Sequence, residues 1–335
     1  MRYALFIFVG LLFIVPSANA DTGRFIDLQV VVYDDRFYSF IDRGSQVEIL
    51  ADELEWAEGP VWVDSLKALL FSDVAANRIY HWDESGGLRV FVHPSGHAPD
   101  KLATSWRGSN GLAIDKNGAL LLAQQSNRTL SRMSVPLGNP AAAYEVLASK
   151  FDGKLLNSPN DLVVHHSGDV YFTDPPYGLA GFEKSPDIEL DFFGVFRLTN
   201  NNDLLLVSRD LEKPNGIALS TDQSTLYVSN SEADKAHIIA IELDKQGKPG
   251  SSRLFFDGAK LISDGPGSTD GMVVHSSDCL FVSVPNGLAV LSPTGELLGK
   301  VALGHVTNMT FNTTYSYLYI TSPEKLLRLK IKRMP

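Results

Sequence analysis

One pattern recurs six times along this chain and limits what the chain can fold into. Each copy has a polar residue, a short apolar run, a turn rich in Gly, Asp, Ser or Asn, and a second apolar run. Short apolar runs bounded by such turns indicate β-strands, and no stretch after the N-terminal leader keeps a 3.6-residue period. The polar residues that open the six copies, at spacings of 52, 50, 55, 55 and 38 residues, are Glu58, Asn110, Asn160, Asn215, Asp270 and Asn308.

Six β-repeats of about this length predict an all-β fold, a six-bladed β-propeller whose blades are four-stranded sheets. The last copy has only 27 residues after Asn308, too few for four strands with their loops. We therefore expect residues from about 25 to 57 to complete the last blade and close the ring, which also covers an otherwise exposed sheet edge. A β-sandwich is the alternative, but it does not explain six copies in register. Residues 21–335 are predicted to form a single domain.

The first twenty residues, MRYALFIFVGLLFIVPSANA, read as a signal peptide cleaved before Asp21. A retained anchor is the alternative, although the apolar run is short for a membrane span. We expect an exported protein, periplasmic or secreted, with no membrane span after cleavage. A net charge of −10 without a basic cluster argues against nucleic acid as a partner. The only cysteine is Cys279, so no internal disulfide can form. The oligomeric state stays open.

The repeat register also predicts a site. Equivalent positions of propeller blades converge at one mouth of the central channel, so the six opening residues should form a ring there. Each of them alone is explained as a turn residue, since Asn-Gly and Asp-Gly are common turn pairs. Together they offer two carboxylates and four amides, which are oxygen ligands that suit Ca²⁺. Mg²⁺, Mn²⁺ and Zn²⁺ are not excluded, although zinc prefers imidazole or thiolate ligands.

Three histidines are alternative candidates for metal ligands. His165, His166 and His275 lie five or six residues beyond a ring position, or roughly 16 Å along a strand. They are predicted to be solvated residues of hairpin turns, far from the ring.

Several stretches carry a family resemblance: WAEGPVW, NGLAIDKNGALL, NSPNDLVV, YFTDPPYGL, KPNGIALS and DGMVV. From about residue 35 to the C-terminus the chain resembles the gluconolactonase and senescence-marker-protein (regucalcin) family of six-bladed propellers. The resemblance implies one divalent metal, usually calcium, at the channel mouth. Its ligands would be Glu58 of EGP, Asn160 of SPND, Asn215 of PNG and Asp270 of DGM. Asp270 would also be the general base.

The remaining candidates would contact the substrate or stand behind the ligands. Asn110 and Asn308 complete the ring but match the ligand motifs less well. Asp174 and Tyr177 of DPPYG are expected to line the entrance, and the loop from Gly178 to Phe193 is a candidate lid. Where similar proteins often have His-Gly before Asn-Arg, this chain has Gln125 and Ser126 ahead of Asn127 and Arg128. We expect Gln125 to affect the choice of substrate.

These features favour an enzyme, a metal-dependent lactonase acting on a small-molecule lactone. The ion would polarise the carbonyl, and Asp270 would take a proton from the attacking water; attack by a metal-bound hydroxide is the variant. Hydrolysis of a phosphotriester at the same centre is one alternative. A non-catalytic propeller that binds a ligand or a protein is another, because a fold alone never establishes activity. The chain has no G-x-S-x-G, H-E-x-x-H, C-x-x-C, P-loop or Rossmann pattern.

Overall fold

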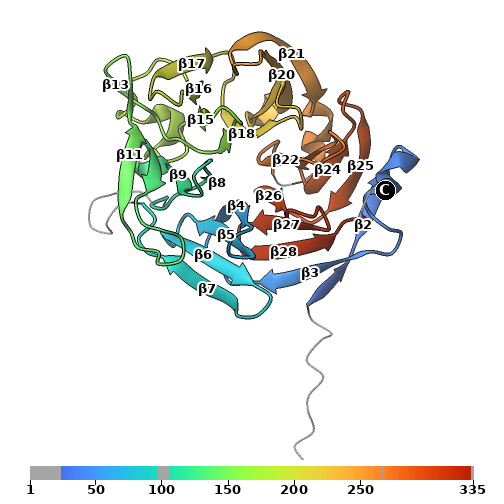
Figure 1. The fold of residues 1–335 in the computed structure, drawn as a ribbon. Helices are drawn as coiled ribbons and strands as arrows, with labels where there is room; N and C mark the ends of the chain where they lie inside the picture. The colour runs from blue at the N-terminus through green and yellow to red at the C-terminus, as the bar shows by residue number, and fades with distance from the viewer. Residues whose placement is uncertain (1–23, 97–105, 266, 333–335) are drawn as a thin grey trace, which may run out of the picture.

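A computed structural model describes residues 24–96, 106–265 and 267–332. Six β-sheets stand side by side around a central axis, so the predicted six-bladed propeller is confirmed (Figure 1). Within these residues the only helices are short 3₁₀ segments: η1 (Asp35–Ser39), η2 (Gln125–Asn127), η3 (Phe182–Lys184), η4 (Ala233–Lys235) and η5 (Ala259–Asp264). None of the described helices has the length and apolar character needed to cross a membrane. The predicted signal peptide, residues 1–20, lies outside the described residues.

Four blades consist of four consecutive antiparallel strands, running from the innermost strand to the outermost. The first has β4 (Ala57–Val63), β5 (Ala68–Asp73), β6 (Arg78–Asp83) and β7 (Gly87–Val92). The second has β8 (Leu112–Ile114), β9 (Leu120–Gln124), β10 (Thr129–Met133) and β11 (Tyr144–Ala148). The third has β14 (Leu162–Val164), β15 (Val170–Asp174), β16 (Gly194–Leu198) and β17 (Leu204–Ser208). The fourth has β18 (Pro214–Leu219), β19 (Thr225–Asn230), β20 (His237–Leu243) and β21 (Pro249–Asp257). A small hairpin of β12 (Lys150–Phe151) and β13 (Lys154–Leu155) links the second and third blades.

The last two blades use the N-terminal segment. The fifth has β22 (Met272–Val274), β23 (Leu280–Val284), β24 (Gly287–Leu291) and β25 (Leu297–Ala302); the sixth has β26 (Asn308–Phe311), β27 (Tyr317–Ser322) and β28 (Lys325–Lys330). As expected, β3 (Gln46–Ala51) pairs with β28 and supplies the missing fourth strand. β1 (Phe25–Asp27) also joins the sixth blade, as expected, but β2 (Gln29–Val32) departs from the prediction because it pairs with β25 of the fifth.

Apolar side chains fill the spaces between neighbouring blades. The largest core cluster joins the fifth blade, through Phe281 and Val290, to the sixth, through Leu318 and Leu327. Phe37 of η1 is fully buried in the same cluster, so the N-terminal segment is part of the core as well as of the sheets. Because each blade buries both faces against its neighbours, the six sheets stabilise one another.

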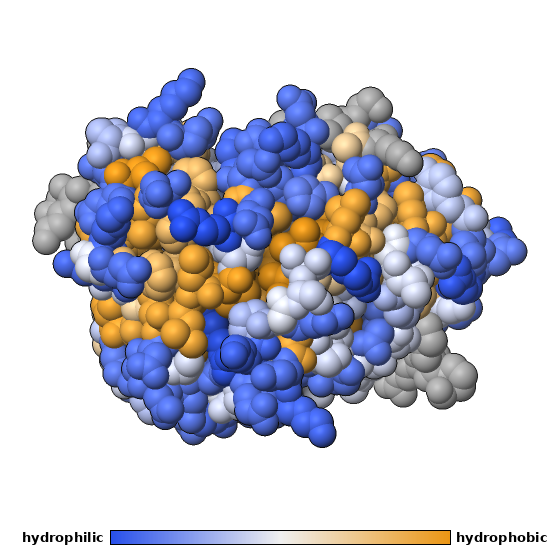
Figure 2. Space-filling model, turned by 90° about the horizontal axis from the view of Figure 1, so that it is seen from above, coloured by the Kyte–Doolittle hydropathy of each residue, from blue (hydrophilic) through white to orange (hydrophobic). Residues whose placement is uncertain are grey.

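The outermost strands carry the exposed apolar residues. Val90, Val146, Leu205 and Leu254 lie on the outer strands of the first four blades and are between 45% and 58% exposed. Figure 2 views the side of the ring where β17 and β21 lie and shows apolar residues gathered there between hydrophilic margins.

The three histidines lie in hairpin turns, as predicted, but the prediction that all of them are solvated is wrong. His165 and His275 follow β14 and β22 in the hairpin turns, but they are only 2% and 1% exposed. His275 packs edge-on against the rings of Phe40, Phe311 and Tyr315. The turn directs both imidazoles inward between blades, and only His166 is exposed.

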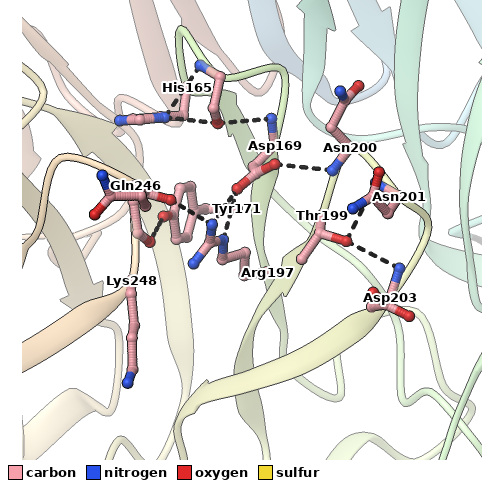
Figure 3. A network of polar contacts seen from close by, with 12 residues as sticks. His165, Asp169, Tyr171, Arg197, Thr199, Asn200, Asn201, Asp203, Gln246 and Lys248 are labelled. Atoms are coloured by element: carbon pink, nitrogen blue, oxygen red, sulfur yellow. Dashed lines mark hydrogen bonds and ion pairs between the residues drawn. The ribbon is translucent and has the colours of Figure 1, made fainter.

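His165 lies beside a polar network that joins the third blade to the fourth (Figure 3). Arg197 of β16 forms an ion pair with Asp169, at 2.7 Å from Nε, and donates to the carbonyl oxygen of Gln246. The Tyr171 hydroxyl donates to the carbonyl oxygen of Gly247. These bonds hold the hairpin between β20 and β21 against the neighbouring blade.

Candidate functional site

The six ring positions lie at the start of the innermost strand in every blade. Glu58, Asn215 and Asn308 belong to β4, β18 and β26, and the other three stand two residues ahead of β8, β14 and β22. Neighbouring inner strands contact each other all the way round, including β26 with β4. Each Asn-Gly or Asp-Gly pair thus opens an inner strand or leads directly into one, and none of them connects two strands of a hairpin.

The glycine after a ring residue serves close packing. A Cβ on Gly59 or Gly216 would overlap the carbonyl oxygen of the next ring residue, Asn110 or Asp270. A Cβ on Gly111 would stand 2.7 Å from Asp161 Oδ1, and one on Gly271 would collide with the Asn308 side chain. At these four positions only a residue without a Cβ lets the inner strands converge this closely.

Gly216→Ala is therefore expected to destabilise the fold by about 1–3 kcal/mol, because the new methyl group must displace the Asp270 backbone. Chemical denaturation measures the change in free energy of unfolding. Gly138→Ala is the matched control, since a Cβ there meets nothing within 4 Å. Equal stability of the two variants would contradict the close-packing account.

Buried hydroxyl groups of the second strands fix the ring backbone between blades. Thr173 donates to the carbonyl oxygen of Asn215 at 2.7 Å, and Ser229 donates to that of Asp270 at 2.9 Å. The Asp270 N–H in turn donates to Ser283 Oγ at 2.8 Å. Each of these hydroxyls is fully buried, so the ring side chains project from a rigid base.

A cavity of about 260 Å³ opens over this ring. Five ring residues line it, namely Glu58, Asn110, Asn160, Asn215 and Asp270. Gln125 and Tyr177, both predicted from sequence, line it as well. The remaining lining residues are Trp56, Trp106, Phe182, Ser231, Gly267, Ser268 and His305.

Two carboxylates, those of the buried Glu58 and the half-buried Asp270, dominate the electrostatics of the cavity. Burial raises the pKa of Glu58 well above its ordinary value, and the negative charges of Asp270 and Asp161 raise it further. Burial, followed by the charge of Asp161, also raises the pKa of Asp270. No ion pair to Glu58 or Asp270 occurs within the part of the chain that the structure describes. Such acids favour a bound cation or a proton.

The amide side chains beside these acids have polar atoms that no hydrogen bond occupies. The side chains of Asn160 and Asn215 form no hydrogen bond with other described residues, and Asn110 Oδ1 is buried without a partner. The described residues contain no group of three or more His, Cys, Asp or Glu side chains that could hold a metal. Two carboxylates with uncommitted amide oxygens nevertheless fit a hard divalent cation such as Ca²⁺, which accepts mixed oxygen ligands and water.

Asn308 differs from the other ring residues because its side chain does not line this cavity. Its Nδ2 donates to Asp161 Oδ2 at 3.3 Å, across the channel, and both residues line a second cavity of about 450 Å³. Burial raises the pKa of Asp161 to about 6, although the Leu162 N–H donates to it at 2.9 Å. The Ile217 N–H also donates to Asp161 Oδ2, at 3.4 Å, so Asp161 connects its own blade with the fourth and the sixth.

Asp174 and Arg128 also stand behind the cavity wall, so the expectation that Asp174 lines the entrance is wrong. Asp174 is fully buried and accepts hydrogen bonds from the backbone N–H and side chain of Asn157 at 2.8 and 3.0 Å. Burial raises its pKa to about 7. Arg128 donates from Nε to the carbonyl oxygen of Leu156 at 2.6 Å. Both residues support the turns that present Tyr177 and Gln125.

The sequence analysis did not predict three of the aromatic residues that line the cavity, although each lies shortly before a ring residue in the sequence. Trp56, Trp106 and His305 precede the ring residues of their blades by two, four and three positions. The chain crosses the channel mouth at these positions as it enters each inner strand, so the residues just before a ring residue lie at the rim.

Fold and cavity together define a six-bladed propeller with an acidic, amide-lined site at one channel mouth. The chain belongs to the SMP-30/gluconolactonase/LRE-like family, whose model matches residues 56–324. It is 35% identical over 311 residues to a gluconolactonase of Zymomonas mobilis, covering 91% of this chain and 86% of that one. A solved gluconolactonase of Xanthomonas campestris is 28% identical with a TM-score of 0.77, covering 92% of this chain and 98% of the other. A regucalcin of Agrobacterium tumefaciens described as calcium-binding shares the fold at 16% identity and a TM-score of 0.64, covering 85% of this chain and 94% of that one.

Proposed function

We propose that this protein is a metal-dependent lactonase, with a divalent cation, Ca²⁺ first, held by Glu58, Asn160, Asn215 and Asp270. The observation that carries the proposal is a pair of carboxylates that line a cavity beside uncommitted amides and have no cationic partner among the described residues. The family and the gluconolactonase names of its relatives support lactone hydrolysis. The calcium-binding description of one structural neighbour supports the choice of ion.

A cation held by these four residues would supply Lewis-acid chemistry at the lactone carbonyl oxygen. Asp270 accepts a proton from the attacking water or positions that water, since its carboxylate lies on the cavity surface. Asn110 is held by Gln125, whose Oε1 accepts from its Nδ2 at 3.3 Å. The two amides are placed to bind hydroxyl or ring oxygens of the substrate.

The test is a substrate panel on chelator-treated protein to which Ca²⁺, Mg²⁺, Mn²⁺ or Zn²⁺ is returned singly. A pH-stat follows sugar lactones, simple lactones and a phosphotriester, and elemental analysis counts the bound metal. We expect lactone turnover that depends on one metal per chain. Turnover of the phosphotriester alone would establish the rival hydrolase, and tight ligand binding without any turnover would establish a binding propeller.

Export is a separate part of the proposal. The leader of residues 1–20 supports it through its apolar run and small-residue ending. Expression of the full chain in a bacterial host, with intact mass measured on the cell-envelope and cytoplasmic fractions, tests it. We expect a periplasmic or secreted form that begins at Asp21, and a full-length cytoplasmic product would refute it.

A further inference from the structure

The cavity over the ring has a fixed aromatic part. Trp56 packs edge-on against Trp106, with ring centroids 4.7 Å apart, and against His305 at 5.5 Å. Edge-on pairs of this kind hold rings in defined orientations. These three residues and Tyr177 line the same cavity as the polar ring. A ligand that fits there meets both polar side chains of the ring and flat aromatic surfaces.

Phe182 lines this cavity too, but its backbone conformation and the exposure of its ring are both energetically unfavourable. It lies in η3, within the loop that follows the third blade's second strand, and its side chain is 42% exposed. Its backbone has a φ of 53°, in the left-handed region, directly after Gly181 at 84°. A bulky residue in that region is strained, and an exposed phenyl ring loses the benefit of burial. No ring contact to Phe182 is found among the described aromatic residues.

The turn that carries Phe182 is nevertheless anchored. The Phe182 N–H donates to the carbonyl oxygen of Leu179 at 3.1 Å, and the Ser185 N–H donates to that of Phe182 at 3.0 Å. Glu183, the next residue, pairs with Lys213 at 3.8 Å, and the same ammonium group pairs with Glu232 at 3.3 Å. Glu232 directly follows Ser231 of the cavity wall. The turn that carries the Phe182 ring is thus fixed beside the cavity.

We propose that Phe182 is a specificity-determining residue that stacks on the substrate and selects cyclic esters with a flat apolar C–H face. This inference rests on the proposed lactonase function and names the substrate feature that the site recognises. The ester oxygens face the amides and carboxylates of the ring, while the phenyl group covers the opposite, apolar side. Binding buries the exposed ring, and an aromatic surface suits the C–H face of a lactone.

The experiment compares Phe182→Ala and Phe182→Gly with wild type in the metal-loaded protein. Both variants lose the phenyl ring, whereas only glycine accepts the left-handed backbone without strain. We expect KM for a sugar lactone or a six-membered lactone to rise about tenfold in both, with kcat within about twofold, because the contact acts in binding. Thermal unfolding should place Phe182→Gly about 2 °C or more above Phe182→Ala. Phe25→Ala is the matched control, since Phe25 is 46% exposed on β1, and it should change neither constant.

A second readout does not require turnover. Binding of a hydrolysis-resistant lactam of the same ring size is followed by fluorescence of the cavity tryptophans Trp56 and Trp106. We expect both Phe182 variants to weaken it about tenfold. An unchanged KM together with unchanged lactam binding would overturn the role of Phe182 and leave the lactonase proposal intact. Absence of lactone turnover in wild type with any metal would instead overturn the proposed function.

Discussion

Asp270→Asn is expected to lower kcat for lactone hydrolysis by about a hundredfold or more, the range observed for removal of a general base. The amide keeps the shape of the side chain but cannot accept the proton of the attacking water. It also removes one of the two carboxylates that face the cavity, so metal affinity should fall as well. Steady-state kinetics with metal content measured on the same samples checks both effects, and Asp203→Asn, a change of an exposed acid, is the control.

In the metal-free protein, Asp270→Asn should raise the stability of the fold. The pKa values of Glu58 and Asp270 are raised in the folded chain, which therefore holds protons that the unfolded chain releases. Stability of the metal-free wild type then falls as the pH rises from the ordinary carboxyl range toward the raised values. At pH 8 we expect chelator-treated Asp270→Asn to melt about 2–5 °C above wild type. Full activity, or a lower melting temperature without metal, would contradict the role given to Asp270.

Arg197→Ala is expected to cost about 3–5 kcal/mol of stability, because it leaves the Asp169 carboxylate buried without its cation. The side chains of Arg197 and Asp169 are only 11% and 5% exposed. Arg197 also donates to the carbonyl oxygen of Gln246, so the substitution removes a bond between blades as well (Figure 3). Urea denaturation measures the loss, and lactone KM should not change, since neither residue lines the cavity over the ring.

Two further variants test whether the loss of stability comes from the buried charge of Asp169. Arg209→Ala breaks the exposed pair with Asp191, at 3.6 Å, and should cost less than about 1 kcal/mol. The double variant Arg197→Met with Asp169→Leu removes both charges and should recover most of the lost stability. If the double variant is as unstable as Arg197→Ala alone, the unpaired Asp169 charge is not the cause.

The sequence predicted the propeller because its repeat is visible at the polar residues that open each blade. The same register predicted that Glu58, Asn160, Asn215 and Asp270 come together, since six equivalent positions must converge on one axis. Register alone does not set side-chain direction, which depends on neighbours. Asn308 turns down the channel because Asp161 accepts its amide, and Asp174 turns away from the cavity because Asn157 donates to it twice.

Other features of the site depend on contacts between distant parts of the chain. The turn carrying Phe182 is fixed by Lys213, thirty residues later, and hydropathy does not reveal such a pair. His165 and His275 were expected in water because hairpin turns are usually exposed. Their rings turn inward since neighbouring blades leave room there for an aromatic group, as the contacts of His275 with Phe40 and Phe311 show.

The sixth blade is assembled from the two ends of the chain. β3 near the N-terminus pairs with β28 near the C-terminus, and Arg328 binds Glu48 across a separation of 280 residues. During synthesis β3 can pair early with β1, but β28, its other partner, and β25, the partner of β2, are made only near the end of the chain. Phe25, Val30 and Val31 of β1 and β2 stay exposed even in the final fold. Contacts this distant in sequence form slowly, and unpaired strands invite aggregation. We therefore expect the yield of folded protein to depend on how well β1, β2 and β3 are kept from other chains in that interval.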